Sequence, residues 1–321
     1  MNLGLDSSST GIRKISRDFC DSLSGKAKYT LANIETDPWL DPVDRVRFSG
    51  RIGTSFAPID ENGIPVVIRH RSKKRGYRPG RVASYALACW NTHRQTGDEL
   101  YRIVFLKCAE WFMQFDGGRF LNDFGTGALN APWISGLSQS LGISVLVRAY
   151  LLTQDDRFLV QSRKALRPML VPIEKGGVAS RLADGSFFIE EYPINDPRHV
   201  LNGFLSAVFG IMDLHRVDPS QRTKVAVDDC WATLNDNIAH WNLNGWSAYD
   251  LHNYQHNGLR NFATASYHSL HIVQLRYALA QTGNRRFQEL SSQWRHNLEI
   301  TSRRMHAHFA KIHYRIRGAS G

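Results

Sequence analysis

Four short turns divide most of this chain into pairs of helical segments. Each turn separates a stretch with apolar residues at helical spacing from a second amphipathic stretch, and the turns lie roughly 57 to 66 residues apart. They are Thr96-Gly97-Asp98, Thr153-Gln154-Asp155, Val217-Asp218-Pro219 and Thr282-Gly283-Asn284. This period is too long for tetratricopeptide or HEAT repeats but suits helical hairpins joined by long loops. The pattern predicts a mainly α fold, an α/α toroid or partial toroid of helical hairpins.

Two regions depart from the helical pattern. Between residues 37 and 68, Pro, Gly and Asp turns separate short β-prone pieces at residues 46–48, 52–56 and 65–68. Between residues 176 and 193, Asp184-Gly185 precedes the β-prone run Ser186-Phe187-Phe188-Ile189, which predicts a β-hairpin insertion. We therefore expect an N-terminal arm with a small β region over residues 1–75 and a helical domain over residues 76–321. The long loops of that domain are expected to carry the functional side chains.

The net charge of the chain limits its choice of partner. The formal charge is +11, which favours an anionic partner such as a polyanionic sugar, a nucleic acid or a membrane surface. No zinc-finger spacing, RNA-recognition signature or helix-turn-helix stands out, so nucleic acid is disfavoured. No apolar run reaches the length of a membrane span, and the N-terminus is polar rather than a leader, so we expect a cytoplasmic protein.

The sequence shows no pattern for a metal or a cofactor. The four cysteines lie far apart without a CxxC, so neither a zinc site nor a disulfide framework is indicated. His268 and His271 lack the i, i+4 spacing and the nearby carboxylate of a helical metal site. No nucleophile elbow or phosphate loop occurs either. The expected chemistry therefore depends on side chains alone.

Three polar segments stand out from the helical background. The first is Glu190-Glu191-Tyr192-Pro193, followed by Arg198, His199 and Asn202. Neighbouring carboxylates on a strand face opposite sides, so at most one of the two glutamates can point at a substrate. A solvated pair of glutamates at a strand end is the structural alternative.

The second segment covers residues 247–254, with Arg260 and Asn261 downstream. Its Tyr, His and Asn side chains suit a sugar, because aromatic faces stack on pyranose rings and amides hydrogen-bond hydroxyls. A surface loop tied by its own side chains is the alternative.

The third segment is a helix at residues 267–275. It places Tyr267, His271 and Gln274 on one face, beside an apolar face, as expected of a helix that lines a cavity. For each of these residues alone, a hydrogen-bonded position in the core is the alternative.

Several ordered motifs link these segments to a known family. They are Glu191-Tyr192-Pro193, Leu201-Asn202-Gly203-Phe204, Tyr249-Asp250-Leu251 and Tyr267-His268-x-x-His271, preceded by Tyr77-x-Pro79 and by Pro132-Trp133-x-Ser135 with Gln139. Together they resemble the C-terminal catalytic domain of the glucuronyl C5-epimerases, which convert glucuronate to iduronate in heparan-type polysaccharides. The resemblance covers about residues 77–298.

The resemblance implies roles for particular residues and no cofactor. The implied catalytic residues are Glu191, Tyr192, Tyr249 and Tyr267. The implied substrate-binding residues are Tyr77, Trp133, Gln139, Arg198, His199, Asn202, His252, Arg260 and His271. Tyr267 is expected to face Glu191 or Tyr192 across the sugar, with Tyr249 assisting. His252 stands where the animal enzymes have Arg, which leaves the identity of the substrate open. Family members often form homodimers.

Other functions fit the same residues. A polysaccharide lyase begins with the same C5 proton abstraction and then expels the C4 substituent. A glycoside hydrolase would need Glu190 or Glu191 with Asp250 as its carboxylate pair. A non-catalytic carbohydrate-binding protein is the third alternative. The expected partner is an anionic uronate-containing polysaccharide or lipid-linked oligosaccharide, such as a bacterial surface-polysaccharide precursor.

Overall fold

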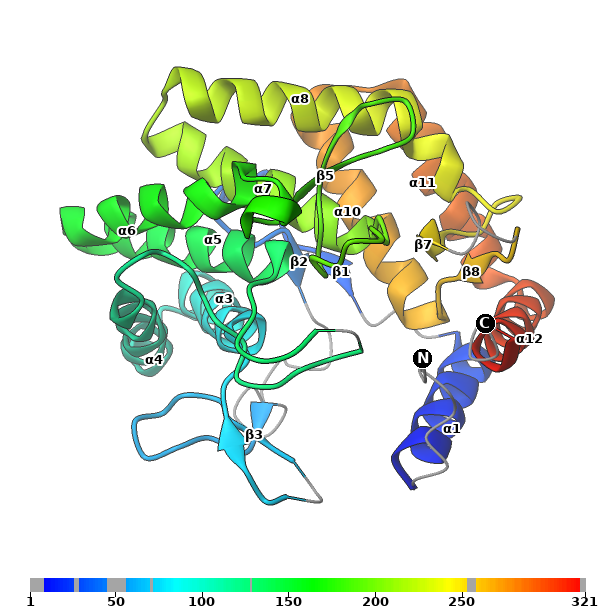
Figure 1. The fold of residues 1–321 in the computed structure, drawn as a ribbon, viewed down its shortest axis with the longest axis horizontal. Helices are drawn as coiled ribbons and strands as arrows, with labels where there is room; N and C mark the ends of the chain where they lie inside the picture. The colour runs from blue at the N-terminus through cyan, green and yellow to red at the C-terminus, as the bar shows by residue number, and fades with distance from the viewer. Residues whose placement is uncertain are drawn as a thin grey trace.

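Four helical hairpins placed side by side form most of the molecule (Figure 1). The computed structural model describes residues 9–25, 29–44, 56–69, 72–127, 129–252 and 258–317. The hairpins are α3 (Pro79–Thr96) with α4 (Glu99–Trp111), α5 (Gly136–Thr153) with α6 (Asp156–Leu166), α7 (Leu201–Val217) with α8 (Gln221–Asn237), and α10 (Ala265–Thr282) with α11 (Arg285–Glu299). Helices α3, α5, α7 and α10 pack against one another in that order. The predicted partial α/α toroid is confirmed.

Three of the four predicted turns share one construction. The first helix ends at a residue with left-handed backbone, Gly97, Gln154 or Gly283, where φ is 72°, 58° or 65°. The next residue, Asp98, Asp155 or Asn284, caps the following helix through its side chain. These turns satisfy backbone groups that helix ends leave without partners. The fourth turn instead uses a capping box between Ser220 and Thr223.

The N-terminal part of the chain contains one helix and short strands. Helix α1 (Ser9–Ser24) precedes β1 (Thr30–Leu31), which pairs antiparallel with β2 (Val43–Asp44). Strand β3 (Val67–Ile68) pairs with β4 (Arg75–Gly76) and lies in the β-prone piece predicted at residues 65–68. The piece predicted at residues 46–48 lies outside the described residues, as does that at 52–56 except for Phe56. In Figure 1, β1 and β2 lie inside the arc of hairpins.

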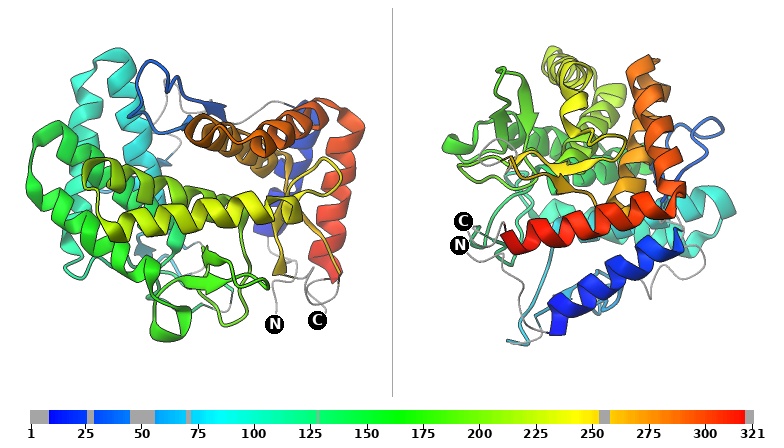
Figure 2. Two further views of the ribbon diagram at one scale, coloured as in Figure 1. Left: turned by 90° about the horizontal axis from the view of Figure 1, so that it is seen from above. Right: turned by 90° about the vertical axis from the view of Figure 1, so that its right-hand side faces the viewer.

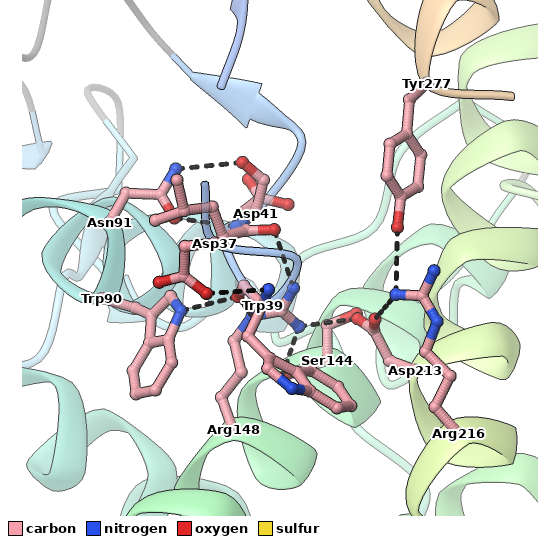
Figure 3. Close-up of polar contacts among 11 residues, drawn as sticks. Asp37, Trp39, Asp41, Trp90, Asn91, Ser144, Arg148, Asp213, Arg216 and Tyr277 are labelled. Carbon is pink, nitrogen blue, oxygen red and sulfur yellow. Dashed lines mark hydrogen bonds and ion pairs between the residues drawn. The ribbon is translucent and has the colours of Figure 1, made fainter. Parts of the chain in front are cut away.

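A buried arginine fastens this N-terminal segment to the inner helices (Figure 3). Arg148 of α5 is 1% exposed and lies 2.6 Å from the Asp213 carboxylate of α7. It also donates hydrogen bonds to the carbonyl oxygens of Trp39, at 2.8 Å, and Leu40. Ser144 donates to the same carboxylate at 2.7 Å. Residues 37–41 therefore pack onto the helical hairpins, while the domain boundary at residue 75 stays a prediction.

Helix α12 (Thr301–Arg317) lies beside α1 at one side of the arc (Figures 1 and 2). The Arg304 guanidinium donates a hydrogen bond to the Ser22 carbonyl, 282 positions earlier in the chain. Arg315 and Asp18 form an ion pair at 2.9 Å. These contacts join the two ends of the described chain. Within that part of the chain, none of the helices has the length and apolar character needed to cross a bilayer.

The predicted hairpin insertion is confirmed and leads directly into the candidate site. Strand β5 (Ala179–Arg181) pairs antiparallel with β6 (Phe187–Ile189). Phe188 stacks on Phe204 of α7 at a ring distance of 4.1 Å, which anchors β6 to the inner helices. A second pair, β7 (Ala248–Asp250) and β8 (Asn261–Phe262), precedes α10. Short 3-10 turns complete the chain at Phe112–Gln114, Arg167–Leu170, Ile173–Lys175 and Ile238–Trp241.

Candidate active site

A cavity of about 260 Å³ lies between the inner helices. Glu191, Asn202 and Tyr267 line it near the first turns of α7 and α10, together with Gln274 from the middle of α10, at what we call its upper end. Its lower end is lined by Ser144 and Asp213, farther along the helices, with Tyr277 of α10, and residues 41–44 add a wall. The cavity follows the inside of the arc, where an α/α toroid presents its inner helices.

The two adjacent glutamates after β6 have separate environments. Glu190 is fully buried and accepts hydrogen bonds from the Ser180 hydroxyl at 2.7 Å and the His199 backbone amide at 3.0 Å. Its carboxylate also lies 2.7 Å from His199 Nδ1. Glu190 and His199 therefore pair with each other outside the cavity, whereas Glu191 lines it. This division agrees with the expectation that only one of the two glutamates faces the site.

Glu191 fits tightly against the start of α7. Asn202 Nδ2 lies 3.5 Å from the Glu191 carboxylate. A Cβ at Gly203 would come within 2.8 Å of Glu191 Cβ and 3.0 Å of its Oε2, so only glycine leaves room for this side chain. Burial raises the pKa of Glu191 to about 7, against the opposing effect of hydrogen bonds from Tyr192 and Asn202. A carboxyl group with this pKa can take up and release a proton near neutral pH.

Tyr249, Tyr192 and Glu191 form a directed chain of hydrogen bonds. The Tyr249 hydroxyl donates to Tyr192, and the Tyr192 hydroxyl donates to Glu191. The negative charge of Glu191 and burial raise the pKa of Tyr192 well above its ordinary value. Burial, followed by the charge of Glu191, does the same for Tyr249. The Tyr267 ring stands edge-on to that of Tyr249, 5.0 Å away, and is 38% exposed.

Polar and aromatic groups surround this chain. The Trp133 ring lies 6.0 Å from the Tyr192 ring, and its indole nitrogen donates to the Phe124 carbonyl. The side-chain oxygens of Asn202 and Gln274 are buried without a hydrogen-bond partner among the residues described here. Both residues line the cavity, so their oxygens can accept hydrogen bonds from a ligand.

Tyr77 is engaged at the junction of β4 and α3. Its hydroxyl donates to Asp60 at 2.7 Å, and this hydrogen bond is the main cause that raises the pKa of Tyr77 to about 12. Gln139 is fully buried, where its amide group bonds the backbone of Gly118, Phe120 and Ala165. The amide of Gln139 therefore joins two backbone segments, residues 118–120 and the end of α6 at Ala165, and does not reach the cavity.

His271 does not share the cavity-lining face of α10 with Tyr267 and Gln274, so that expectation is wrong. The residues of α10 that line the cavity are Tyr267, Leu270, Gln274 and Tyr277. His271 is turned instead toward the start of β7, where its Nδ1 lies 2.8 Å from the Ser247 hydroxyl. Burial lowers its pKa well below the ordinary value, so its imidazole is neutral. His268 meets the same hydroxyl at 2.8 Å.

The remaining predicted cations lie on the loops around the site. The charge of Arg198 acts on Asp250 of β7. His252 Nδ1 lies 3.5 Å from the Asp196 carboxylate. Arg260 lines a separate cavity of about 270 Å³, whose other residues include Arg303, His306 and the aromatic Trp246 and Phe262. The structure thus brings Glu191, Tyr192, Tyr249, Tyr267, Asn202 and Trp133 together, whereas Arg260 lines a different cavity.

One residue beside the site has no counterpart in the sequence motifs. Lys311 of α12 places its ammonium group 5.0 Å from the centre of the Tyr249 ring. It follows the last motif by some forty residues, and no local spacing marks it. Among the described residues, no three His, Cys, Asp or Glu side chains gather as metal ligands.

The family described as D-glucuronyl C5-epimerase C-terminus matches residues 107–296, more than half of the chain. The protein belongs to this C5-epimerase family. The match includes Glu191 and the three tyrosines of the site and ends before α12.

Two relatives show how much of the chain is shared. A D-glucuronyl C5-epimerase of Caenorhabditis elegans is 29% identical over 157 residues, which cover 45% of this chain and 25% of that protein. An uncharacterized protein of Methanocaldococcus jannaschii is 25% identical over 180 residues, covering 55% of this chain and 56% of that protein. This C5-epimerase family member therefore spans about a quarter to a half of the length of these relatives.

Among solved structures, a polysaccharide lyase matches 68% of this chain and 38% of its own. The two are 15% identical, with a TM-score of 0.37.

Proposed function

We propose that this protein inverts C5 of glucuronate residues in a polysaccharide or oligosaccharide, giving iduronate by removal and return of the C5 proton. The observation that carries the proposal is the directed chain from Tyr249 through Tyr192 to Glu191, with Tyr267 beside it at the upper end of the cavity. Membership of the C5-epimerase family supports the same chemistry.

The reaction demands a base whose pKa suits neutral pH. The C5 hydrogen of a uronate lies α to a carboxylate and is weakly acidic, so the base must be held close to it. Glu191, with its pKa near 7, can receive a proton either directly or through the two phenols. The chain thereby holds the abstracted C5 proton within the site while the opposite face of the sugar receives a different proton.

Inversion also demands a proton donor on the opposite face of the planar intermediate. Tyr267 is the proposed donor, because it comes from α10 rather than from the Glu191 loop and its ring meets Tyr249 edge-on. A neutral phenol suits this role. In the reverse reaction, from iduronate to glucuronate, Tyr267 acts as the base and the chain from Glu191 to Tyr249 supplies the proton.

The substrate carboxylate needs positive charge while the intermediate forms. Arg198 is the proposed partner, since His199 is paired with Glu190 and His271 is buried and neutral. Trp133 offers a flat face for a neighbouring sugar ring. Arg260, Arg303 and His306 line the separate basic cavity, where we place a further anionic sugar of the polymer.

The test is proton NMR of glucuronate-containing polysaccharides incubated with the protein in deuterium oxide, with ultraviolet absorbance recorded for unsaturated uronate. Deuterium at C5 without unsaturation is the expected result, and it should be lost in Tyr267→Phe. Tyr101→Phe on the outer helix α4 is the matched control and should retain exchange. Unsaturated product would identify a lyase instead. Absence of both signals on polymers with different partner sugars would overturn the proposal.

A further inference from the structure

We propose that Lys311 is a positioning residue of this site, which stabilises the phenolate form of Tyr249 that takes the C5 proton. The inference rests on the proposed function and names a residue outside the region that the family matches. Lys311 lies beside Tyr249, the residue at which the hydrogen-bond chain from Glu191 ends.

Contacts from two directions hold the Lys311 ammonium group in place. It lies 5.0 Å from the centre of the Tyr249 ring and 5.6 Å from that of Tyr314. It also donates a hydrogen bond to the side-chain oxygen of Asn261 in β8. Asn261 is the register partner of Asp250, the residue after Tyr249. The hairpin that presents Tyr249 therefore also presents the group that fixes Lys311.

The surrounding charges come from several elements. Asp250 of β7 acts most strongly in favour of the charged ammonium, and Asp18 of α1 acts in the same direction. Arg315 of α12 and Lys14 of α1 oppose it. Burial outweighs these effects and lowers the pKa of Lys311 to about 7. Beyond Asp250 lie Arg198 and His252, whose charges act on that carboxylate.

The direction of the hydrogen bonds explains why a cation belongs beside Tyr249. When Glu191 takes the hydroxyl proton of Tyr192, Tyr192 takes that of Tyr249, and the negative charge moves from Glu191 to the Tyr249 oxygen. Tyr249 then takes the C5 proton as the C5–H bond breaks, and its electron pair stays on the uronate. Glu191 ends protonated and both phenols are neutral again. A cation over the ring of Tyr249 lowers the free energy of the phenolate in this sequence.

The kinetic test compares Lys311→Arg with Lys311→Met on a polysaccharide of alternating glucuronate and N-acetylglucosamine. Loss of the charge in Lys311→Met should lower kcat for C5 exchange about 10- to 1,000-fold with little change in KM, since a neighbouring charge shifts a pKa by roughly one to three units. Lys311→Arg should retain most of the activity. Lys224→Met, on the exposed face of α8, is the matched control and should leave kcat unchanged.

The pH profile separates a charge effect from a packing effect. Lys311 is charged below its pKa of about 7, so kcat should fall as the pH rises above this value. In Lys311→Arg this alkaline limb should move to higher pH, because a guanidinium stays protonated. The inference would be overturned if the alkaline limb of the pH profile stayed in place in Lys311→Arg. It would also be overturned if Lys311→Met had the same kcat as the wild type.

A second measurement needs no substrate and so stands apart from the proposed function. Tyrosinate absorbance, measured at alkaline pH where circular dichroism shows an intact fold, should be higher in Lys311→Arg than in Lys311→Met. The difference should vanish in a Tyr249→Phe background. Equal absorbance in the two variants would refute the role of Lys311 even in a wild-type protein that is inactive on the polymer. Conversely, if the two variants differed in tyrosinate absorbance as expected but the wild type showed no C5 exchange on any polymer, only the proposed function would be refuted.

Discussion

The two ends of the central cavity are built on the same helices but differ in the partner of their buried carboxylate, which is a cation at the lower end and neutral groups at the upper end. At the lower end, Arg148 lies beside Asp213, Ser144 donates to that carboxylate, and backbone carbonyl oxygens accept further hydrogen bonds from the guanidinium. At the upper end, Glu191 has the phenol of Tyr192 and the amide of Asn202 as partners. A buried charge with an opposite charge and full hydrogen bonding holds structure together. A buried acid with titratable neighbours marks a place for proton transfer.

The largest expected effect belongs to the upper end. Tyr267→Phe removes one hydroxyl and should lower C5 exchange about 100- to 10,000-fold, the usual contribution of a positioned acid or base. The melting temperature should stay unchanged, because the Tyr267 side chain is partly exposed. Exchange by NMR and thermal unfolding by circular dichroism measure the two quantities. Near-normal exchange would remove Tyr267 from the reaction.

At the lower end the loss should appear in stability instead. Arg148→Met removes the buried cation that lies 2.6 Å from Asp213 and leaves that carboxylate only the partly exposed Arg216 at 3.8 Å, so it should lower the free energy of unfolding by about 3–5 kcal/mol. Urea denaturation measures it. The double variant Arg148→Met with Asp213→Leu should recover most of this loss, since no buried charge is left alone. Unchanged stability with a reduced kcat would reverse the contrast between the two ends.

The pH dependence of the reaction should come from the upper end. Burial raises the pKa of Glu191 to about 7, and the base acts in its deprotonated form. On the acid side, kcat should therefore increase about tenfold for each pH unit up to this value. The Lys311→Arg background isolates this acid limb, because its alkaline limb is displaced. Glu191→Gln should remove the acid limb of the pH profile along with most of the activity. An unchanged acid limb in that variant would show that another group causes it.

The smallest effect tests a single hydrogen bond of the lower network. Ser144→Ala removes the hydroxyl that donates to Asp213 and should cost about 1 kcal/mol in the free energy of unfolding. C5 exchange per folded molecule should stay the same. A fall in exchange larger than the fall in stability would show that the lower end takes part in the chemistry.

Sequence reasoning works where the signal is local. The left-handed residues Gly97 and Gly283 and the caps after them are visible in the chain, so the hairpins and their order follow from the sequence. The motifs around Glu191 and Tyr249 likewise point to one site, and the structure brings them into one hydrogen-bond chain.

Other features depend on contacts that no short pattern records. His271 follows Tyr267 by one helical turn, yet it contacts Ser247 of a distant segment and does not line the cavity. The partners of Gln139 come from two separate backbone segments, residues 118–120 and Ala165. Lys311 reaches Tyr249 because α12 packs beside α1 and β8, which a pattern within α12 does not reveal.

The long sequence separation of the closing contacts bears on the order of folding. Each hairpin joins neighbouring segments, whereas Arg148 meets Trp39 across 109 positions and Arg304 meets Ser22 across 282. Contacts of high sequence separation carry a large loop-closure cost and form slowly. The hairpins can thus acquire their helices before residues 37–41 and α12 are in place. During refolding, the helical circular-dichroism signal should return before the proposed C5 exchange does, because Lys311 on α12 reaches Tyr249 only after these long-range contacts have formed.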